Sequence, residues 1–326
     1  MISIILKKVK NTKNKHLRKA FIYFIYNCCN FFAKFNICSK LNFNGITFYS
    51  PINHPSVFWS NLYPLMNSNL ARTASTIHTF RPNSSFIDIG SNIGDTWAIL
   101  RSTNPANLIL LIEGDLASFK WLKLNTATDS NVILWNGFIA PKDEGYQFEG
   151  SGNGSSGMLI KNSNDMSESI KTLDEVVAHT NFKNIGLIKV DTDGLDTLIV
   201  KSGKNTILEY CPVLFLEIQP YHLFRNDNFF SFLDFLKNLG YEHLILWDSN
   251  GRLVSCMSIS NVDILSDLLP YFSGAPDFLF LDIAFVHASD SKMNDHLIDS
   301  ERSNCVSFYS KELLIDENIT SQFYKK

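Results

Sequence analysis

The chain has 326 residues, of which 45% are hydrophobic and 19% are charged, with 29 Lys and Arg against 32 Asp and Glu. This composition excludes a disordered chain, which would be poor in apolar residues, and 16 Gly with 10 Pro exclude a collagen-like chain. A chain of this length can bury a large core in one domain or two.

The basic and acidic residues are separated along the chain. Residues 1–87 contain eleven Lys or Arg and no acid, and the first acidic residue is Asp88. Such a separation suggests that the front of the chain faces an anionic partner, such as a membrane or a nucleic acid. No recognised nucleic-acid motif accompanies the basic residues, which disfavours nucleic acid.

The first predicted element is a helix over Ala20–Phe35, which is apolar but interrupted by Asn27, Asn30 and Lys34. It is shorter than the roughly 20 residues that a membrane span needs, and no small-residue cleavage site follows it, as a signal peptide would require. Two compatible interpretations remain. The helix packs its apolar side on the rest of the protein, or it lies on an anionic membrane surface.

Six scattered cysteines form no CxxC pair and have no His cluster nearby. The sequence therefore indicates neither a zinc site nor a disulfide framework. Reduced thiols in the cytoplasm are the simplest interpretation.

From Ser85 onward, short apolar runs alternate with segments of helical length. The runs are Ser85–Gly90, Leu108–Glu113, Asn131–Trp135, Ile185–Asp191, Val213–Ile218, His243–Trp247 and Phe278–Val286. The candidate helices are Asp95–Ser102, Ala117–Thr126, Leu173–Thr180, Asp196–Leu208 and Asn228–Leu239. This alternation predicts an α/β fold with a doubly wound, mostly parallel, seven-stranded sheet. The last two strands, joined without an obvious helix, are expected to form an antiparallel hairpin at one edge.

We expect three parts: a basic, mainly helical N-terminal accessory region over residues 1–80, the α/β domain over 81–288, and a C-terminal peripheral tail over 289–326. The tail is polar and is expected to form a peripheral helix or to remain partly disordered. The Gly, Ser and Asn-rich segment Gly145–Ser169 is expected to be a mobile loop or a small hairpin over the site.

Ligands of such sheets bind at the carboxyl ends of the strands. The first strand ends in a turn from Asp88 through Gly90 and Asn92 to Gly94, where glycines allow a ligand to approach the backbone. The G-x-x-x-G spacing lacks the second glycine of the dinucleotide fingerprint, which disfavours NAD, and no P-loop occurs. Glu113 ends the second strand, where a carboxylate can accept both hydroxyls of a ribose. Together these features favour a nucleoside cofactor without a pyrophosphate.

The segment Phe86–Gly94 resembles the first motif of S-adenosylmethionine-dependent methyltransferases with a Rossmann-like fold. Later segments narrow the resemblance to the FkbM family: Ile112–Asp115, Thr172–Asp174 and Leu187–Asp196, the last of which is close to the family pattern K-I-D-V-E-G-x-E. Asp193 and Asp196 stand where the family usually has glutamates, and Gly114 stands where it usually has proline. The resemblance spans about Ser85 to Val286 and leaves out the basic front.

This resemblance implies S-adenosylmethionine as the cofactor. The residues that it places around the methionine part are Asp88, Gly90, Ser91, Asn92 and Gly94. It places Glu113 on the ribose and, by topology, Asn136 and Phe138 near the adenine. Asp191 ends the fourth strand and is expected to face both the cofactor and the acceptor.

The candidate catalytic residues are Asp191, Asp193 and His222. The two aspartates could act as general base, orient an acceptor hydroxyl or hold a divalent metal, which the sequence does not otherwise indicate; alternatively, Asp191 only caps the next helix. His222 could act as a base or be a solvated loop residue. Lys189 could pair with one of the aspartates, and His54 is a weaker candidate base.

For the function, the resemblance implies O-methylation of a sugar or another intermediate of polysaccharide biosynthesis. Two alternatives stay open: a non-catalytic protein that retains the cofactor within a glycan assembly complex, and a nucleotide-sugar transferase that uses Asp191-Thr192-Asp193 as a D-x-D metal motif. We expect a cytoplasmic protein, with peripheral contact to the inner face of an anionic membrane through residues 1–35.

Overall fold

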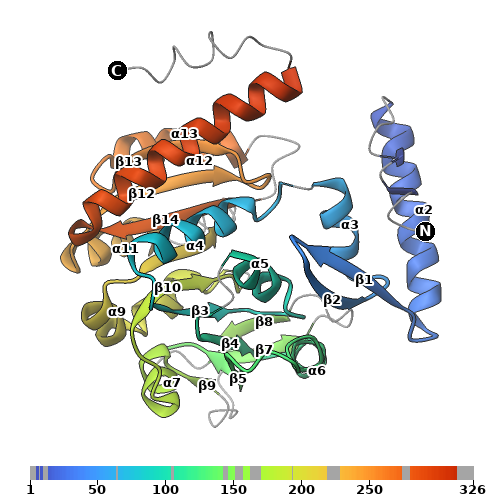
Figure 1. Ribbon diagram of the computed structural model, residues 1–326, viewed down its shortest axis with the longest axis horizontal. Helices are drawn as coiled ribbons and strands as arrows, with labels where there is room; N and C mark the ends of the chain where they lie inside the picture. The colour runs from blue at the N-terminus through green and yellow to red at the C-terminus, as the bar shows by residue number, and fades with distance from the viewer. Residues whose placement is uncertain are drawn as a thin grey trace.

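The computed structural model describes residues 5–6, 8–9, 14–63, 65–103, 106–141, 146–150, 157–161, 170–192, 194–218, 228–273 and 280–313. Its centre is an eight-stranded sheet (Figure 1). In spatial order the strands are β13 (Leu253–Ser258), β12 (Tyr241–Asp248), β14 (Leu281–His287), β11 (Val213–Ile218), β10 (Ile185–Val190), β3 (Ser85–Ile89), β4 (Ile109–Glu113) and β5 (Val132–Asn136). The five strands from β11 to β5 are parallel, whereas β14 is antiparallel to both of its neighbours and β13 is antiparallel to β12. The mostly parallel α/β sheet predicted from the alternating pattern is confirmed.

All seven expected strands are present, and β13 is an eighth that the sequence analysis missed. The edge hairpin exists, but β12 and β13 form it. The expectation that the last two predicted strands connect without a helix is wrong, because helix α12 (Val262–Ser273) lies between β13 and β14. This helix was not predicted because its sequence contains Pro270, and proline normally ends a helical pattern.

The expected helices are also present: α5 (Asp95–Thr103), α6 (Leu116–Asn125), α7 (Leu173–Thr180), α8 (Asp196–Lys201), α9 (Lys204–Tyr210) and α11 (Asn228–Asn238). The predicted helix over Asp196–Leu208 is divided into α8 and α9 around Gly203. A Cβ at Gly203 would lie 2.5 Å from the Leu173 side chain, so α7 packs closely on the junction. Buried apolar clusters cover both faces of the sheet, as a doubly wound fold requires.

The N-terminal segment consists of α2 (Lys15–Ala33), strands β1 (Cys38–Phe43) and β2 (Ile46–Pro51), and helices α3 (Pro55–Leu62) and α4 (Ser68–Phe80). The hairpin of β1 and β2 was not expected. Its turn is Asn44–Gly45, with both residues at positive φ, which is the typical geometry of a two-residue hairpin turn. In this segment Phe48, Val57 and Leu70 are buried in the same cluster as Phe86 of β3, so the segment packs on the sheet domain.

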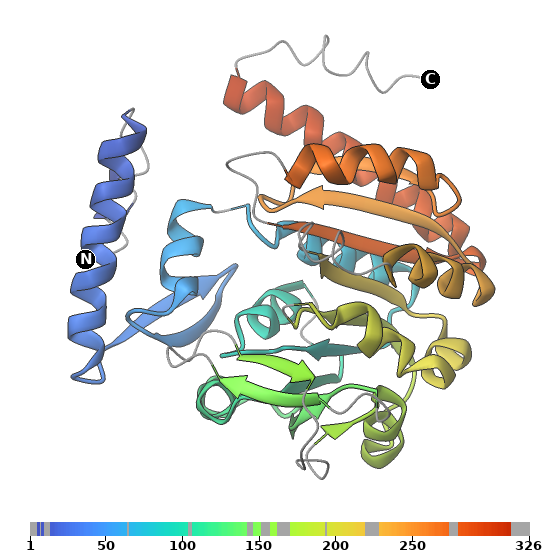
Figure 2. The same ribbon diagram turned by 180° about the vertical axis from the view of Figure 1, so that it is seen from behind.

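Helix α2 stands at one edge of the molecule, next to the β1–β2 hairpin and α3 (Figures 1 and 2). Ile25 and Cys29 are buried on its inner side, and Tyr26 packs edge-on against Phe58 of α3. The expected packing on the rest of the protein is therefore present on one face. Among the helices that the structure describes, none combines the length and the apolar character needed to cross a bilayer.

Two small sheets lie beside the central one. Strand β6 (Phe138–Ile139) pairs with β9 (Ile170–Lys171), and β7 (Tyr146–Gly150) pairs with β8 (Gly157–Lys161) in an antiparallel hairpin. The segment Gly145–Ser169 thus contains the small hairpin that was one of its two expected forms. Gly145, residues 151–156 and residues 162–169 lie outside the described residues.

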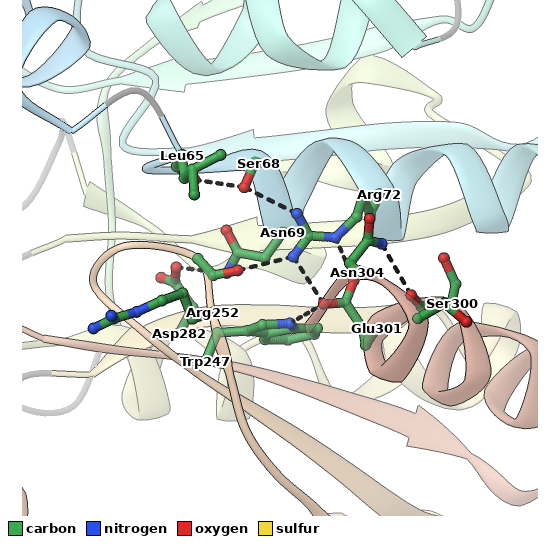
Figure 3. A network of polar contacts seen from close by, with 12 residues as sticks. Leu65, Ser68, Asn69, Arg72, Trp247, Arg252, Asp282, Ser300, Glu301 and Asn304 are labelled. Atoms are coloured by element: carbon green, nitrogen blue, oxygen red, sulfur yellow. Dashed lines mark hydrogen bonds and ion pairs between the residues drawn. The ribbon is translucent and has the colours of Figure 1, made fainter. Parts of the chain in front are cut away.

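The C-terminal segment forms a 3-10 turn, η2 (Ala288–Asp290), and helix α13 (Ser291–Leu313). Glu301 of α13 is almost fully buried and accepts a bidentate ion pair from Arg72 of α4, at 2.6 and 2.7 Å, and a hydrogen bond from the indole of Trp247 at 2.7 Å (Figure 3). Asn69 of α4 donates to Asp282 of β14 at 2.7 Å. These bonds, referred to below as the Glu301 network, link the segments that precede and follow the sheet domain in the chain, which lie together on one face of the sheet. The division at residues 80 and 288 stays a prediction.

Candidate functional site

A pocket of about 370 Å³ lies at the carboxyl ends of β3, β4, β10 and β11. The sheet order reverses between β3 and β10, because the chain continues outward to β4 on one side and to β11 on the other. Open α/β sheets bind ligands at such a switch point, and the volume lies within the range of about 300–1,000 Å³ for small-molecule sites. The pocket is therefore the candidate site.

The turn after β3 forms one wall. Gly90 has a φ of +80°, and a Cβ there would lie 2.0 Å from the carbonyl oxygen of Asp191. The close approach of the β10 strand end thus requires glycine at this position, and the approach of a ligand to the same backbone stays a prediction. Ser91 is buried: its hydroxyl donates to the Asp88 carbonyl at 2.8 Å and accepts the Ile112 N–H at 3.1 Å. It shapes the turn without lining the pocket.

One lysine bridges two acidic residues: Asp88 on β3 and Asp191, which directly follows β10. Lys189 Nζ lies 3.2 Å from a carboxylate oxygen of each, and Asp88 also accepts the Thr96 hydroxyl at 2.5 Å. Burial lowers the pKa of Lys189, but the carboxylates of Asp191 and Asp88 outweigh it and raise the pKa above its ordinary value. The lysine therefore stays charged. Asp88 is fully buried behind the pocket, whereas Asp191 is about one-third exposed and lines it.

Glu113 ends β4 and faces the pocket. Its two carboxylate oxygens accept the backbone N–H groups of Asn92 and Asp115, each at 2.7 Å. Burial nevertheless raises the pKa of Glu113 to about 7. Near neutral pH this side chain therefore exists both as the acid and as the carboxylate.

Further carboxyl groups gather on the β10 and β11 side. Glu217 lines the pocket and pairs in register with Asp282 of β14. Burial, together with the negative charges of Asp191 and Asp282, raises the pKa of Glu217 well above its usual range. Asp196 accepts the N–H groups of Thr192 and Gly194, so this residue, and not Asp191, holds the loop after β10.

The N-terminal segment contributes the opposite wall through His54, Ser56, Trp59 and Met66. The Ser56 N–H donates to His54 Nδ1 at 3.3 Å, and the Ser56 hydroxyl donates to Asp95 at 2.7 Å. Accepting at Nδ1 leaves the ring proton on Nε2. Burial lowers the pKa of His54 although Asp95 and the Asn92 side chain act in the opposite direction, and the ring therefore stays neutral.

Phe138 covers the pocket at the end of β4. A Cβ on Gly114 would lie 2.1 Å from the Phe138 ring, so the glycine that replaces the usual proline makes room for this ring. Asn136 does not line the pocket. Its side-chain amide donates to the Glu113 carbonyl at 2.8 Å and thereby fixes the end of β4.

Residues 88–243 match the family model described as the methyltransferase FkbM domain. The chain carries an FkbM methyltransferase domain. No curated protein matches the chain. Among solved structures it resembles the methyltransferase FkbM of Methylobacillus flagellatus KT, with 16% identity and a TM-score of 0.38 over 62% of this chain and 43% of that one. It also resembles fibrillarin of Aeropyrum pernix, which contains natively bound S-adenosyl-L-methionine, with 10% identity and a TM-score of 0.36 over 66% of this chain and 76% of that one. The chain thus spans less than half the length of the Methylobacillus protein.

S-adenosylmethionine is the cofactor that goes with the FkbM domain, and the pocket suits it. Five of the predicted site residues line the pocket together: Gly90, Asn92, Glu113, Phe138 and Asp191. Four others do not line the pocket but hydrogen-bond within the turn after β3 or at the end of β4: Asp88, Ser91, Gly94 and Asn136. Asp193 and His222 lie outside the described residues. Within the part of the chain that is described, no group of three or more His, Cys, Asp or Glu could hold a metal ion.

Two contributions to the pocket were not predicted from the sequence. Glu217 was detectable, because it follows an apolar run in the same way as Glu113 does. The wall of Trp59 and Met66 had no signal in the sequence, since these residues precede the FkbM domain and reach the pocket only through tertiary packing. His54, which was a weak candidate, lies on this wall.

Proposed function

We propose that the protein transfers a methyl group from S-adenosylmethionine to a hydroxyl of a sugar or another glycan-pathway intermediate. The observation that carries this proposal is the meeting of Glu113, Asp191 and Glu217 in one pocket of an FkbM domain. When bound, the cofactor supplies a methyl group on a positively charged sulfur. An acid-rich pocket suits that charge, and among its described lining residues Lys189 is the single Lys or Arg.

In this proposal the pocket residues divide between the two substrates. Glu113 accepts the ribose hydroxyls, the Phe138 ring covers the adenine, and the turn at Gly90 and Asn92 borders the methionine part. The acceptor enters from the side of Trp59, whose ring offers an apolar surface to a sugar face.

Asp191 and Glu217 are the carboxyl groups that can serve the acceptor hydroxyl. Asp191 is fixed by Lys189, 3.2 Å away, and can orient the hydroxyl. Burial raises the pKa of Glu217 well above its usual range, so its carboxylate is a stronger proton acceptor than that of an exposed glutamate. With the cofactor bound, the bond between the methyl carbon and the sulfur would break as the acceptor oxygen bonds to that carbon, and one of these carboxylates would take the oxygen's proton. Asp193 and His222 stay further candidates for this proton transfer.

Calorimetry with S-adenosylhomocysteine tests the cofactor part. We expect binding by the protein and loss of binding in Glu113→Ala. Binding of a nucleotide sugar alone would instead support the transferase that uses Asp191 and Asp193 in a D-x-D motif.

Incubation with labelled cofactor and a lysate glycan fraction, followed by mass spectrometry, tests the reaction. A labelled glycan carrying one extra methyl group is expected. Cofactor binding without transfer to any glycan would favour the alternative of a non-catalytic binding protein in a glycan assembly complex.

We also place this activity in the cytoplasm, at the inner face of a membrane. Six free thiols suit a reducing compartment. The membrane contact rests on α2, which is treated next.

A further inference from the structure

Helix α2 has two apolar faces, and only one of them is packed. Ile22, Ile25, Tyr26, Cys29 and Ala33 recur at helical spacing and lie in or against the core on the inner face. The outer face carries a second stripe at spacings of three, four and seven residues, which the turn directly after the helix continues: Leu17, Phe21, Phe24, Phe31 and, in the turn, Phe35. Their exposed fractions are 49, 45, 65, 56 and 64%. We define these five residues as the α2 stripe.

The α2 stripe is unusual for a protein surface. Exposed apolar residues are normally scattered singly, and a contiguous set of large rings marks an interaction site. Phe31 and Phe35 touch edge-to-face, with ring centroids 5.5 Å apart, so the stripe is continuous at this end. The described residues that precede α2 do not cover it, because Leu6 and Val9 are themselves buried while the stripe stays exposed.

The N-terminal segment is also basic around the helix. His16 and Lys19 are exposed on α2, Lys34 is exposed directly after it, and Lys40 is exposed on β1. No acidic residue occurs anywhere before Asp88 to balance them. An acidic protein partner would match the charges but would not require a ring-lined face along the whole helix. Large apolar side chains beside Lys on one helix are typical of helices that lie within the headgroup layer of an anionic bilayer.

We propose that the α2 stripe docks the protein on an anionic phospholipid membrane. The rings enter the headgroup and acyl boundary, and the lysines contact lipid phosphates. The opposite face of α2 stays packed against α3, with Asn53 donating to Asn30 at 3.0 Å. Helix α3 lies beside α2 (Figure 2). Because His54 at the start of α3 and Trp59 within it line the pocket, docking would hold the pocket close to the lipid surface.

The test is co-sedimentation of the full chain with vesicles of phosphatidylcholine alone or with added phosphatidylserine. We expect binding to the anionic vesicles and weak binding to the neutral ones. The Phe21→Ser/Phe24→Ser/Phe31→Ser variant should lose at least about tenfold in affinity, since each ring contributes buried apolar area. As a matched control, Leu116→Ser/Leu124→Ser removes two equally exposed apolar side chains from α6 and should bind like the unchanged protein.

The Lys19→Gln/Lys34→Gln variant should bind several-fold more weakly and depend less on salt. For the unchanged protein, raising the salt from about 0.1 M to about 1 M, which shortens the Debye length from about 10 Å to about 3 Å, should reduce binding. Equal binding of the triple Phe variant and the unchanged protein would overturn the proposal. So would a dimer in light scattering that the triple Phe variant converts to a monomer, without vesicle binding, because the stripe would then join two copies.

Calorimetry with S-adenosylhomocysteine is run on every variant. Unchanged cofactor affinity shows that the variants are folded and attributes lost vesicle binding to the stripe. If neither the unchanged protein nor any variant binds S-adenosylhomocysteine, the proposed function fails. The vesicle result still decides the docking proposal in that case.

Discussion

Glu113 changes its protonation state in the pH range in which the protein is expected to work. Its raised pKa of about 7 means that the carboxylate, the better acceptor for two ribose hydroxyls, forms only as the pH rises through neutrality. We predict that the affinity for S-adenosylhomocysteine increases up to about tenfold between pH 6 and pH 8, as a calorimetric series would show. Glu113→Gln should bind weakly with no such dependence. A flat profile for the unchanged protein would contradict the assignment.

Asp191 and Glu217 are separable by their effects on turnover. Asp191→Asn and Glu217→Gln should each lower the methyl-transfer rate. The larger loss, of about a hundredfold or more, is expected for the substitution of the residue that takes the proton. The affinity for S-adenosylhomocysteine should change little, because neither residue is assigned to the ribose. Glu242→Gln, which alters an exposed carboxyl on β12, is the control. Unchanged turnover in both pocket variants would remove these residues from the reaction.

At the scale of elements, the turn after β3 and the end of β10 depend on Gly90. Both Gly90 and Gly45 have positive φ, but a Cβ on Gly45 would meet nothing within 4 Å. Gly45→Ala should therefore cost only the backbone strain of about 1–3 kcal/mol. Gly90→Ala should cost about 3 kcal/mol or more, because the Asp191 carbonyl must also move, and cofactor binding should be lost. Urea unfolding of both variants measures the difference, and equal losses would argue against the contact.

The elements that could be predicted from the sequence are those buried on both faces. The run of β3, with Phe86 and Ile87 fully buried on opposite faces, leaves a plain apolar signal. Strand β13 left none, because it is half-exposed and contains Ser255 and Ser258. The β1–β2 hairpin did leave a local signal at Asn44–Gly45, which the analysis passed over. In the site, the acidic residues at strand ends could be found from the sequence. The pairing of Lys189 with two carboxylates could not, because it depends on the register between neighbouring strands.

At the scale of the whole molecule, the Glu301 network should contribute strongly to stability. Glu301→Ala removes the acceptor of both Arg72 and the Trp247 indole and leaves buried donors unpaired. We predict a loss of about 3–5 kcal/mol in the free energy of unfolding, measured by urea titration. Asp299→Ala on the same helix removes only an exposed pair with Arg302 and should change stability by less than about 1 kcal/mol. Similar losses in both variants would contradict the importance of burial.

Asp282 should make stability depend on pH. Burial raises its pKa from 3.8 to about 7, so between these values the folded protein holds a proton that the unfolded chain has released. The stabilisation from this group is thus present at low pH and is lost as the pH rises toward 7. In Asp282→Asn the free energy of unfolding should fall less steeply with pH over this range. The slope should decrease by at most about 1.4 kcal/mol per pH unit. Identical slopes in the variant and the unchanged protein would contradict the shift.

The Glu301 network also sets an order of events during synthesis. Arg72 follows Met66 of the pocket wall by less than two helical turns, but its partner Glu301 is translated 229 residues later. Until then the Arg72 guanidinium and the Trp247 indole have no carboxylate to bind. The strands of the sheet are all translated before α13, whereas Arg72 of α4 gains its ion pair with Glu301 only when α13 has been made. The Glu301 network is therefore among the last contacts to form as the chain grows, and it links α4 to the end of the chain after every strand of the sheet has been made.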